Sequence, residues 1–315
     1  MGTWGKYSML ENWIKCMPVL LHIRKIYRFF FFLVKDIIMA ILPRKITDKI
    51  SSYYFKKIRG SVDWFILHLP IVSKCNLNCA SCSTFSPIAY EYYADIFTLK
   101  TDCKRLSDLG NDKIPEIHIL GGEPLLHPQL NTIIEIVRQY FNNAKIKIIT
   151  NGILLSAKDD LFWNCLKENK TDITVSHYPI DIKIKEIRAT ARKFNVNIRY
   201  YRGKLPWFKG NLDPNGNYDS SENFKKCDMP LCCTNLHEGK ISTCNIISKI
   251  QYLNNYFSDV NFEVNDTDYI DIYKVKSIDE IIRFITKPVP FCRYCALKTI
   301  PIKWSRSKKE IHEWI

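Results

Sequence analysis

Cys75-Asn-Leu-Asn-Cys79-Ala-Ser-Cys82 gathers three thiols on one short loop and is the most informative stretch of this chain. It follows residues 64–71, a mainly apolar run that predicts a buried β-strand. Thiolates are soft ligands that suit zinc or iron-sulfur centres, and a closed structural site needs four of them. Three thiols therefore predict a metal site with an open position. From the residues alone, a zinc site completed by His68 or His118 is a competing interpretation.

From residue 64 onward, short apolar runs alternate with polar stretches of helical character. The expected strands are 64–71, 116–120, 145–150, 172–176 and 195–201, and the expected helices lie near 95–110, 128–141, 156–168 and 181–194. This order of strand and helix predicts an α/β fold with a parallel sheet or partial barrel. A transition rich in proline and glycine follows at 206–216, and the alternation becomes less regular beyond it. We therefore expect a barrel over 61–214 and a second, smaller domain over 215–315.

A second motif, Gly121-Gly122-Glu123-Pro124, follows the apolar run Ile117–Leu120 at the end of the second expected strand. The two motifs, in this order and setting, resemble the signature of the radical S-adenosylmethionine (SAM) superfamily. The resemblance implies a partial (β/α)6 barrel in which Cys75, Cys79 and Cys82 hold a 4Fe–4S cluster. It also implies that SAM binds the cluster, and that one electron cleaves SAM to a 5′-deoxyadenosyl radical.

The resemblance further implies which residues contact SAM. Glycines let backbone approach a ligand closely, and the carboxyl ends of barrel strands face the active site. The expected cofactor-binding residues are Gly121, Gly122, Glu123, Pro124, Thr150, Asn151 and Ser176. The candidate catalytic residues are His177, Tyr178 and Arg202. Each of these polar residues is also compatible with an ordinary role in a turn.

One position departs from the family pattern. Ser81 stands before the third cysteine, where the family usually has an aromatic residue that packs near adenine. Another side chain has to supply that contact, and Phe85 is the nearest aromatic candidate.

Six more cysteines gather in the last third of the chain: Cys227, Cys232, Cys233, Cys244, Cys292 and Cys295. Four thiols from two separated segments can close a structural zinc site or a fully ligated 4Fe–4S cluster. The arrangement resembles the twitch domain, a shortened SPASM domain that follows the barrel in some radical SAM enzymes, including a dehydrogenase of an aminocyclitol. The resemblance implies one auxiliary 4Fe–4S cluster on Cys227, Cys244, Cys292 and Cys295. Cys232 and Cys233 stay open as alternative ligands, hydrogen donors or buried residues.

The first 60 residues carry most of the net charge of +14, with twelve Lys or Arg and three acidic residues. The apolar stretch 18–43 is interrupted by charges, which leaves no uncharged run of about 18 residues for a membrane span. Its aromatic residues with flanking basic ones predict an amphipathic helical extension over 1–60 that binds an anionic membrane surface. A helical extension packed on the barrel is the main alternative. Because no secretory signal is evident, we expect a cytoplasmic protein with reduced thiols, peripheral on the inner face of the cell membrane.

These features favour a radical SAM oxidoreductase that abstracts hydrogen from a sugar or cyclitol, leading to dehydrogenation or epimerisation. We expect a small-molecule substrate, with a nucleotide- or lipid-linked sugar as one form of it, and no nucleic-acid partner. The resemblance implies reduced flavodoxin or ferredoxin as electron donor. A radical SAM maturase of peptides or proteins is the alternative within the superfamily. A non-catalytic, membrane-associated zinc-binding module is the alternative from another class.

Overall fold

The computed structural model of the chain describes residues 62–176, 178–200 and 207–315. The expected helical extension over 1–60 lies outside these residues, and so do His177 and Arg202. Among the helices of the described ranges, none is long and apolar enough to cross a bilayer. The membrane attachment of the extension therefore stays a prediction.

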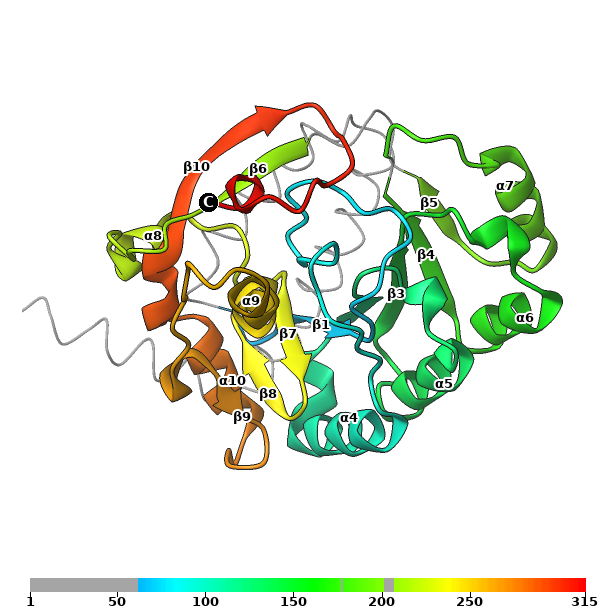
Figure 1. Ribbon diagram of the computed structural model, residues 1–315. Helices are drawn as coiled ribbons and strands as arrows, with labels where there is room; N and C mark the ends of the chain where they lie inside the picture. Colours follow the sequence, from blue (N-terminus) through cyan, green and yellow to red (C-terminus); the bar gives the residue numbers. More distant parts are fainter. Residues whose placement is uncertain (1–61, 177, 201–206) are drawn as a thin grey trace, which may run out of the picture. The chain divides into compact units, whose positions relative to one another are not determined.

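One mixed sheet organises the described part of the chain, with the strand order β5-β4-β3-β2-β1-β7-β8-β9 (Figure 1). Its strands are β1 (Ile66–Pro70), β2 (Glu116–Leu120), β3 (Lys145–Thr150), β4 (Thr171–Val175), β5 (Ile198–Tyr200), β7 (Thr234–His237), β8 (Lys240–Ser242) and β9 (Ile270–Asp271). Strands β1 to β5 pair in parallel, and β7 pairs in parallel with β1 on its other side. The predicted α/β fold with a parallel sheet is confirmed.

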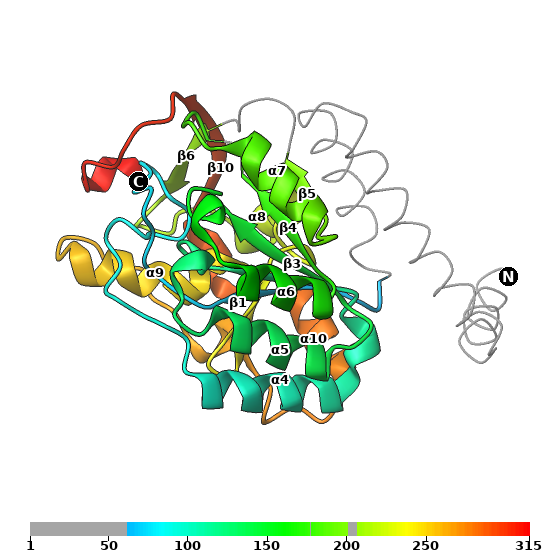
Figure 2. The same cartoon turned by 90° about the vertical axis from the view of Figure 1, so that its right-hand side faces the viewer.

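Helices join the parallel strands and cover the outer side of the sheet (Figures 1 and 2). They are α4 (Ile96–Gly110), α5 (Leu130–Tyr140), α6 (Asp160–Glu168) and α7 (Ile184–Lys193). Helix α5 buries Leu130, Ile133, Ile134 and Val137, which recur at the spacing of one helix face. Since the helices occupy the outside, the other face of β1 to β5 and the carboxyl ends of these strands are left to form the site.

The C-terminal part of the chain continues the same sheet. The hairpin β7–β8 adds to β1, and α9 (Asn245–Tyr256) follows it. A separate antiparallel pair joins β6 (Trp207–Leu212) to β10 (Cys295–Ile302). The sixth parallel strand of the sheet is thus β7, beside β1 and not beyond β5. One sheet contains strands from both sides of residue 214, where a domain boundary is expected. That boundary stays a prediction.

A second apolar core lies mainly in the C-terminal part of the chain, and the remaining helical elements of the described ranges are short. They are α8 (Ser220–Lys226), α10 (Ile278–Ile285) and the short 3₁₀ helices Asn111–Lys113, Pro124–Leu126, Leu155–Ala157, Asp266–Asp268, Pro290–Tyr294 and Ile311–Glu313. The core is built on α9, whose Ile250 and Leu253 pack with Phe262, Phe291 and Trp314. Cys244, Cys292 and Cys295 pack against this cluster. The apolar core therefore holds three of the C-terminal cysteines in place.

Candidate active site

Cys75, Cys79 and Cys82 lie on the loop after β1, at the carboxyl edge of the parallel strands, and all three line one cavity of about 340 Å³. Between them, Asn78 and Ser81 take positive φ angles of 55° and 53°, which coils the loop tightly. In the described ranges, no three Cys, His, Asp or Glu side chains converge on a single ion. A 4Fe–4S cluster binds each thiolate through a different iron, so three thiols spread around one cavity fit a cluster.

Burial controls the ionisation of these cysteines before iron binds. It raises the pKa of Cys75 to about 11 and that of Cys79 to about 12. At neutral pH both are therefore protonated thiols. Iron ligation requires thiolates, so loading the site releases protons.

The glycines of the Gly121–Pro124 loop pack against the cysteine loop itself. A Cβ atom on Gly121 would overlap the carbonyl oxygen of Val72, and one on Gly122 would overlap the carbonyl oxygens of Ser73 and Lys74. The Gly122 amide donates to Val72 O at 2.7 Å, and the Glu123 amide donates to Lys74 O at 2.8 Å. The two loops can approach this closely only because residues 121 and 122 have no side chain. The glycine pair also leaves room beside the cavity.

Glu123 ties this loop to the next strand. Its carboxylate accepts hydrogen bonds from Thr150 Oγ1 at 2.7 Å, from the Asn151 amide at 2.8 Å and from the Leu125 amide at 3.1 Å. Burial raises the pKa of this carboxyl, whereas the three donors lower it. Glu123 is only 1% exposed, and neither it nor Pro124 lines the cavity. Glu123 therefore orients the loop, and its expected contact with SAM stays a prediction.

The other predicted SAM contacts converge on the cavity. It is lined by Gly121, Gly122, Thr150, Asn151, Ser176 and Tyr178 together with the three cysteines. Asn151 Nδ2 donates to Asn76 Oδ1 at 2.7 Å, which links the end of β3 to the cysteine loop. His177 and Arg202 lie outside the described residues, so their catalytic roles stay predictions.

Phe85 does not take the place expected for an adenine contact. It is 1% exposed and packs with Trp314, with a ring-centroid distance of 6.2 Å, and it does not line the cavity. Among the described phenylalanines, tyrosines and tryptophans, Tyr178 lines it. Burial raises the pKa of Tyr178 well above its ordinary value, so its hydroxyl stays protonated. The sequence predicted Tyr178 as a candidate catalytic residue at the site and did not indicate it for adenine.

A row of polar side chains begins at the cavity wall with His68. The sequence indicated His68 and His118 only as alternative zinc ligands and did not predict the row. His68, His118 and Lys147 occupy matching positions on β1, β2 and β3, as the register of these strands shows. His118 Nδ1 lies 3.0 Å from His68 Nε2, and Glu116 Oε1 lies 2.6 Å from both His118 Nε2 and Lys147 Nζ. Burial lowers the pKa of His68 well below its ordinary value. Both ring nitrogens of His118 have partners in this row, His68 and Glu116. The structure therefore gives no support to a zinc site completed by His118.

The C-terminal cysteines form a second group of thiols. Cys227 ends α8, Cys244 precedes α9, and Cys292 and Cys295 flank the end of the 3₁₀ helix Pro290–Tyr294. The pKa of Cys295 is raised first by burial and then by the nearby thiols of Cys244, Cys227 and Cys292. Mutual electrostatic influence of this kind requires proximity, so these four thiols share one neighbourhood. Since no three of the described side chains converge on a single ion, these four thiols suit a cluster, in which each thiolate binds a different iron.

Cys233 lies between the two groups of thiols. It lines the cavity of Cys75, Cys79 and Cys82, and its sulfur lies 3.8 Å from that of Cys232. Its pKa is raised first by the hydrogen bond with Cys232 and then by burial, with smaller effects of Cys227 and Cys244. Of the two cysteines left open by the sequence, Cys233 is the one at the cavity wall.

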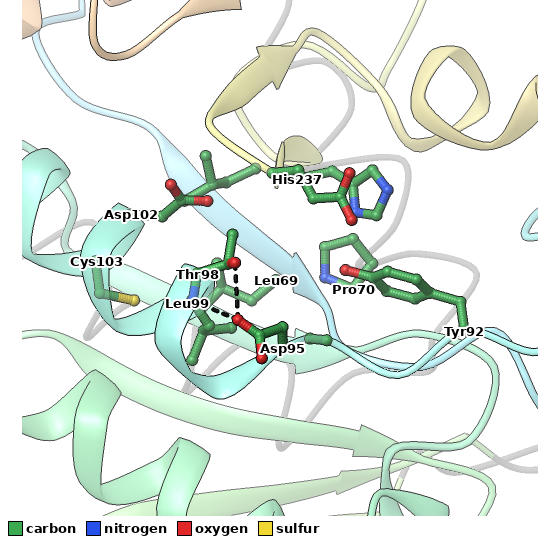
Figure 3. Close-up of a pocket in the computed structure, with 12 residues that line it drawn as sticks. Leu69, Pro70, Tyr92, Asp95, Thr98, Leu99, Asp102, Cys103 and His237 are labelled. Atoms are coloured by element: carbon green, nitrogen blue, oxygen red, sulfur yellow. Dashed lines mark hydrogen bonds between the residues drawn. The ribbon is translucent and has the colours of Figure 1, made fainter.

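A second cavity lies beside α4 and the end of β1, where Figure 3 shows Pro70, Tyr92 and His237 around it. Asp95 Oδ1 there accepts hydrogen bonds from the Thr98 amide and hydroxyl, both at 2.8 Å, which caps α4. Its volume of about 30 Å³ is that of one or two water molecules. It is too small for a substrate, and the candidate active site is the cysteine-lined cavity because of the three thiols on its wall.

Comparison with known proteins agrees with this geometry. Residues 66–177 match a family model described as a 4Fe–4S single cluster domain. A stretch of 95 residues is 30% identical to the GTP 3′,8-cyclase of Campylobacter jejuni strain RM1221, covering 30% of each chain. A stretch of that length is 35% identical to molybdenum cofactor biosynthesis protein 1 of Dictyostelium discoideum, covering 30% of this chain and 15% of that protein.

The first of these matches spans only 30% of the relative's length. Among solved structures, the crystal structure of BtrN in complex with AdoMet and 2-DOIA is similar with a TM-score of 0.48 and 18% identity, covering 74% of this chain and 93% of that one. The 4Fe–4S domain of this chain starts at β1 and includes both loops that build the cavity. We conclude that the matched part of the chain, residues 66–177, is a domain of the radical SAM type, with a 4Fe–4S cluster and SAM as its cofactors.

Proposed function

We propose that the enzyme uses the 5′-deoxyadenosyl radical to abstract hydrogen from a carbinol carbon of a sugar or cyclitol, with dehydrogenation as the leading outcome. When bound, the cluster supplies the electron that cleaves SAM. The observation that carries the proposal is the closeness of the two groups of thiols, which Cys233 links. Cys233 lines the cavity of the three SAM-site cysteines and is influenced by Cys227 and Cys244 of the second group.

The residues at the cavity have distinct roles in this proposal. Cys75, Cys79 and Cys82 hold the cluster, and the loop at Gly121 and Gly122 leaves room for the methionine part of SAM. Thr150, Asn151 and Ser176 offer hydrogen-bonding groups to the carboxylate and ribose of SAM. Exclusion of water from the radical is the main task of the protein in such chemistry.

Dehydrogenation of the carbinol proceeds in two steps. Hydrogen transfer from the carbinol carbon gives 5′-deoxyadenosine and a substrate radical that still carries its hydroxyl. Loss of the hydroxyl proton and of one electron then gives the carbonyl product. The electron needs a one-electron acceptor near the cavity, and the four thiols Cys227, Cys244, Cys292 and Cys295 are suited to hold an auxiliary 4Fe–4S cluster for this purpose. The proposal therefore includes a twitch-like domain in the C-terminal part of the chain, which would hold this auxiliary cluster.

Epimerisation is the second outcome, and Cys233 is the observation that favours it. Its thiol would transfer a hydrogen atom to the opposite face of the substrate radical, forming a C–H bond and leaving a thiyl radical. One electron from the flavodoxin or ferredoxin donor and one proton would restore the thiol. A Cys233→Ala variant separates the outcomes, since it retains dehydrogenation and loses epimerisation.

The test uses the full chain, reconstituted with iron and sulfide without oxygen. Two clusters predict about eight irons per chain, and one cluster predicts about four. Reduction with SAM should release 5′-deoxyadenosine, and Cys79→Ala should abolish this release. Cys244→Ala should keep the release and lose about four irons together with product formation. Bound zinc without iron-sulfur absorption would refute the whole proposal.

The substrate class is tested by stimulation of 5′-deoxyadenosine release. Nucleotide-linked sugars, aminocyclitols and lipid-linked sugars in anionic vesicles are the probes. The basic segment 1–60 supports the vesicle-bound form, because lysines and arginines attract anionic lipids. Stimulation by a peptide, and by none of the sugars, would replace this proposal with the maturase alternative.

A further inference from the structure

The C-terminal segment of the chain returns to the loop that carries the SAM-site cysteines. The Ala80 amide donates to Ser305 O at 2.9 Å, and the Ser307 amide donates to Asn78 O at 2.8 Å. Between these bonds, Cys79 and Arg306 form an antiparallel β-bridge. In Figure 1 this segment, in red, passes beside the loop after β1. The middle cysteine of the loop is thus held from both sides by residues more than 200 positions away.

Two side chains at the end of the segment fasten the rest of the loop. Glu313 Oε2 accepts a hydrogen bond from the Ser81 amide at 3.2 Å, while its Oε1 accepts from the Lys308 amide at 2.8 Å. Trp314 Nε1 donates to the carbonyl oxygen of Cys82 at 3.0 Å. Both side chains are buried, at 7% and 2% exposure. These contacts hold the backbone and do not touch a sulfur.

Trp304 differs from these anchors because it reaches a cysteine sulfur. Its Nε1 lies 3.2 Å from Cys79 Sγ, and its ring is tilted against Tyr178 with a centroid distance of 6.5 Å. An indole nitrogen can only donate, so the sulfur is the acceptor. Hydrogen bonds to cluster sulfurs stabilise the additional negative charge of the reduced state, and they are among the features that set the potential of iron-sulfur clusters.

We infer that Trp304 is a positioning residue that donates a hydrogen bond to the Cys79 thiolate and raises the reduction potential of the SAM-cleaving cluster. The segment Ser305–Ser307 supplies the rigid backbone from which the indole is aimed. The inference depends on the cluster at Cys75, Cys79 and Cys82 and is independent of the substrate. It assigns to the end of the chain a function in the electron transfer that starts catalysis.

The test compares two tryptophans whose indole N–H groups donate hydrogen bonds to different kinds of acceptor. Trp304→Phe keeps an aromatic ring and removes the bond to sulfur, whereas Trp314→Phe removes a bond to a carbonyl oxygen. The midpoint potential is measured by anaerobic redox titration with electron paramagnetic resonance on the reconstituted full chain, also in the Cys244→Ala background so that a second cluster does not overlap. We expect a more negative potential in Trp304→Phe at full iron content, and an unchanged potential in Trp314→Phe.

An unchanged potential in Trp304→Phe, or equal shifts in both variants, would overturn the inference. A second measurement needs no variant and covers the case in which Trp304→Phe loads iron poorly. The wild-type enzyme is labelled with ¹⁵N at the indole nitrogens, and the reduced cluster is measured by electron-nuclear double resonance. A ¹⁵N coupling is expected because the N–H bonds a ligand sulfur. Absence of any such coupling would also overturn the inference.

Discussion

Glu123 Oε1 accepts a hydrogen bond from Thr150 Oγ1 at 2.7 Å, and this bond joins the loop after β2 to the end of β3. The second carboxylate oxygen accepts from the Asn151 amide at 2.8 Å. Thr150 and Asn151 both line the cavity, whereas Glu123 lies behind it. One buried carboxylate therefore fixes the relative position of two loops that face SAM.

Glu123→Ala should destabilise the fold, because it leaves the Thr150 hydroxyl and two backbone amides without an acceptor. Each buried group left unpaired costs about 1–3 kcal/mol. The loss is measured as a decrease in the free energy of unfolding by urea, followed by tryptophan fluorescence. The matched control is Glu186→Ala on α7, since Glu186 forms an exposed ion pair with Lys183. That change should stay within about 0.5 kcal/mol, and equal effects of both substitutions would contradict the role of Glu123.

Gly122→Ala should prevent loading of the SAM-site cluster. The added Cβ would overlap the carbonyl oxygens of Ser73 and Lys74, which belong to the backbone leading into Cys75 and cannot move without moving the cysteine loop. We expect loss of about four irons and of 5′-deoxyadenosine release. Gly110→Ala is the control, because its Cβ would meet only the side chain of Ile278, at the far end of α4. Gly110→Ala should cost stability and keep its full iron content.

Local patterns in the sequence were sufficient to predict the parallel strands, the intervening helices and the two loops at the cavity. The five predicted strands agree with β1 to β5 within a few residues, because buried parallel strands are short continuous apolar runs. The position of β7 beside β1 was not predicted. It depends on a pairing between segments more than 150 residues apart, and no local periodicity encodes such a pairing.

The polar row and the C-terminal contacts escaped prediction for the same physical reason. His68, His118 and Lys147 are ordinary inward positions of three separate strands, and only the register brings them into one row. Trp304 and Cys79 are 225 positions apart. The only sequence signal for the row was a polar residue inside each of three apolar runs.

His68→Gln should make the stability of the protein less sensitive to acid. Burial and the neighbouring His118 lower the pKa of His68 in the fold, whereas the unfolded chain binds a proton near the ordinary value of about 6.5. Below that pH the unfolded state holds the extra proton, so wild-type stability falls with decreasing pH by up to about 1.4 kcal/mol per pH unit. The variant should lack this part of the slope between pH 6.5 and 5.

Urea unfolding of the iron-free protein at several pH values measures this slope. His118, Glu116 and Lys249 also act on His68, and all three remain in the variant. His312→Gln is the control, since that side chain is 70% exposed. Parallel slopes for wild type and His68→Gln would refute the prediction.

Asn223→Ala should weaken the second group of thiols and leave the first intact. Asn223 Nδ2 donates to the carbonyl oxygens of Cys292 and Cys295, at 2.9 and 2.6 Å, and the side chain is 7% exposed. One amide thus holds both ends of the turn that presents these two cysteines. Without it we expect loss of up to about four irons, retained 5′-deoxyadenosine release and diminished product formation.

The control for this change is Asn254→Ala. Asn254 also binds backbone groups, since its side chain donates to Phe262 O and accepts from the Phe262 amide, both at 3.0 Å. Loss of that pair should lower stability by about 1–3 kcal/mol without lowering the iron content. Full iron content in Asn223→Ala would show that the turn at Cys292 and Cys295 needs no support from α8. Loss of deoxyadenosine release would show instead that the two thiol groups do not load independently.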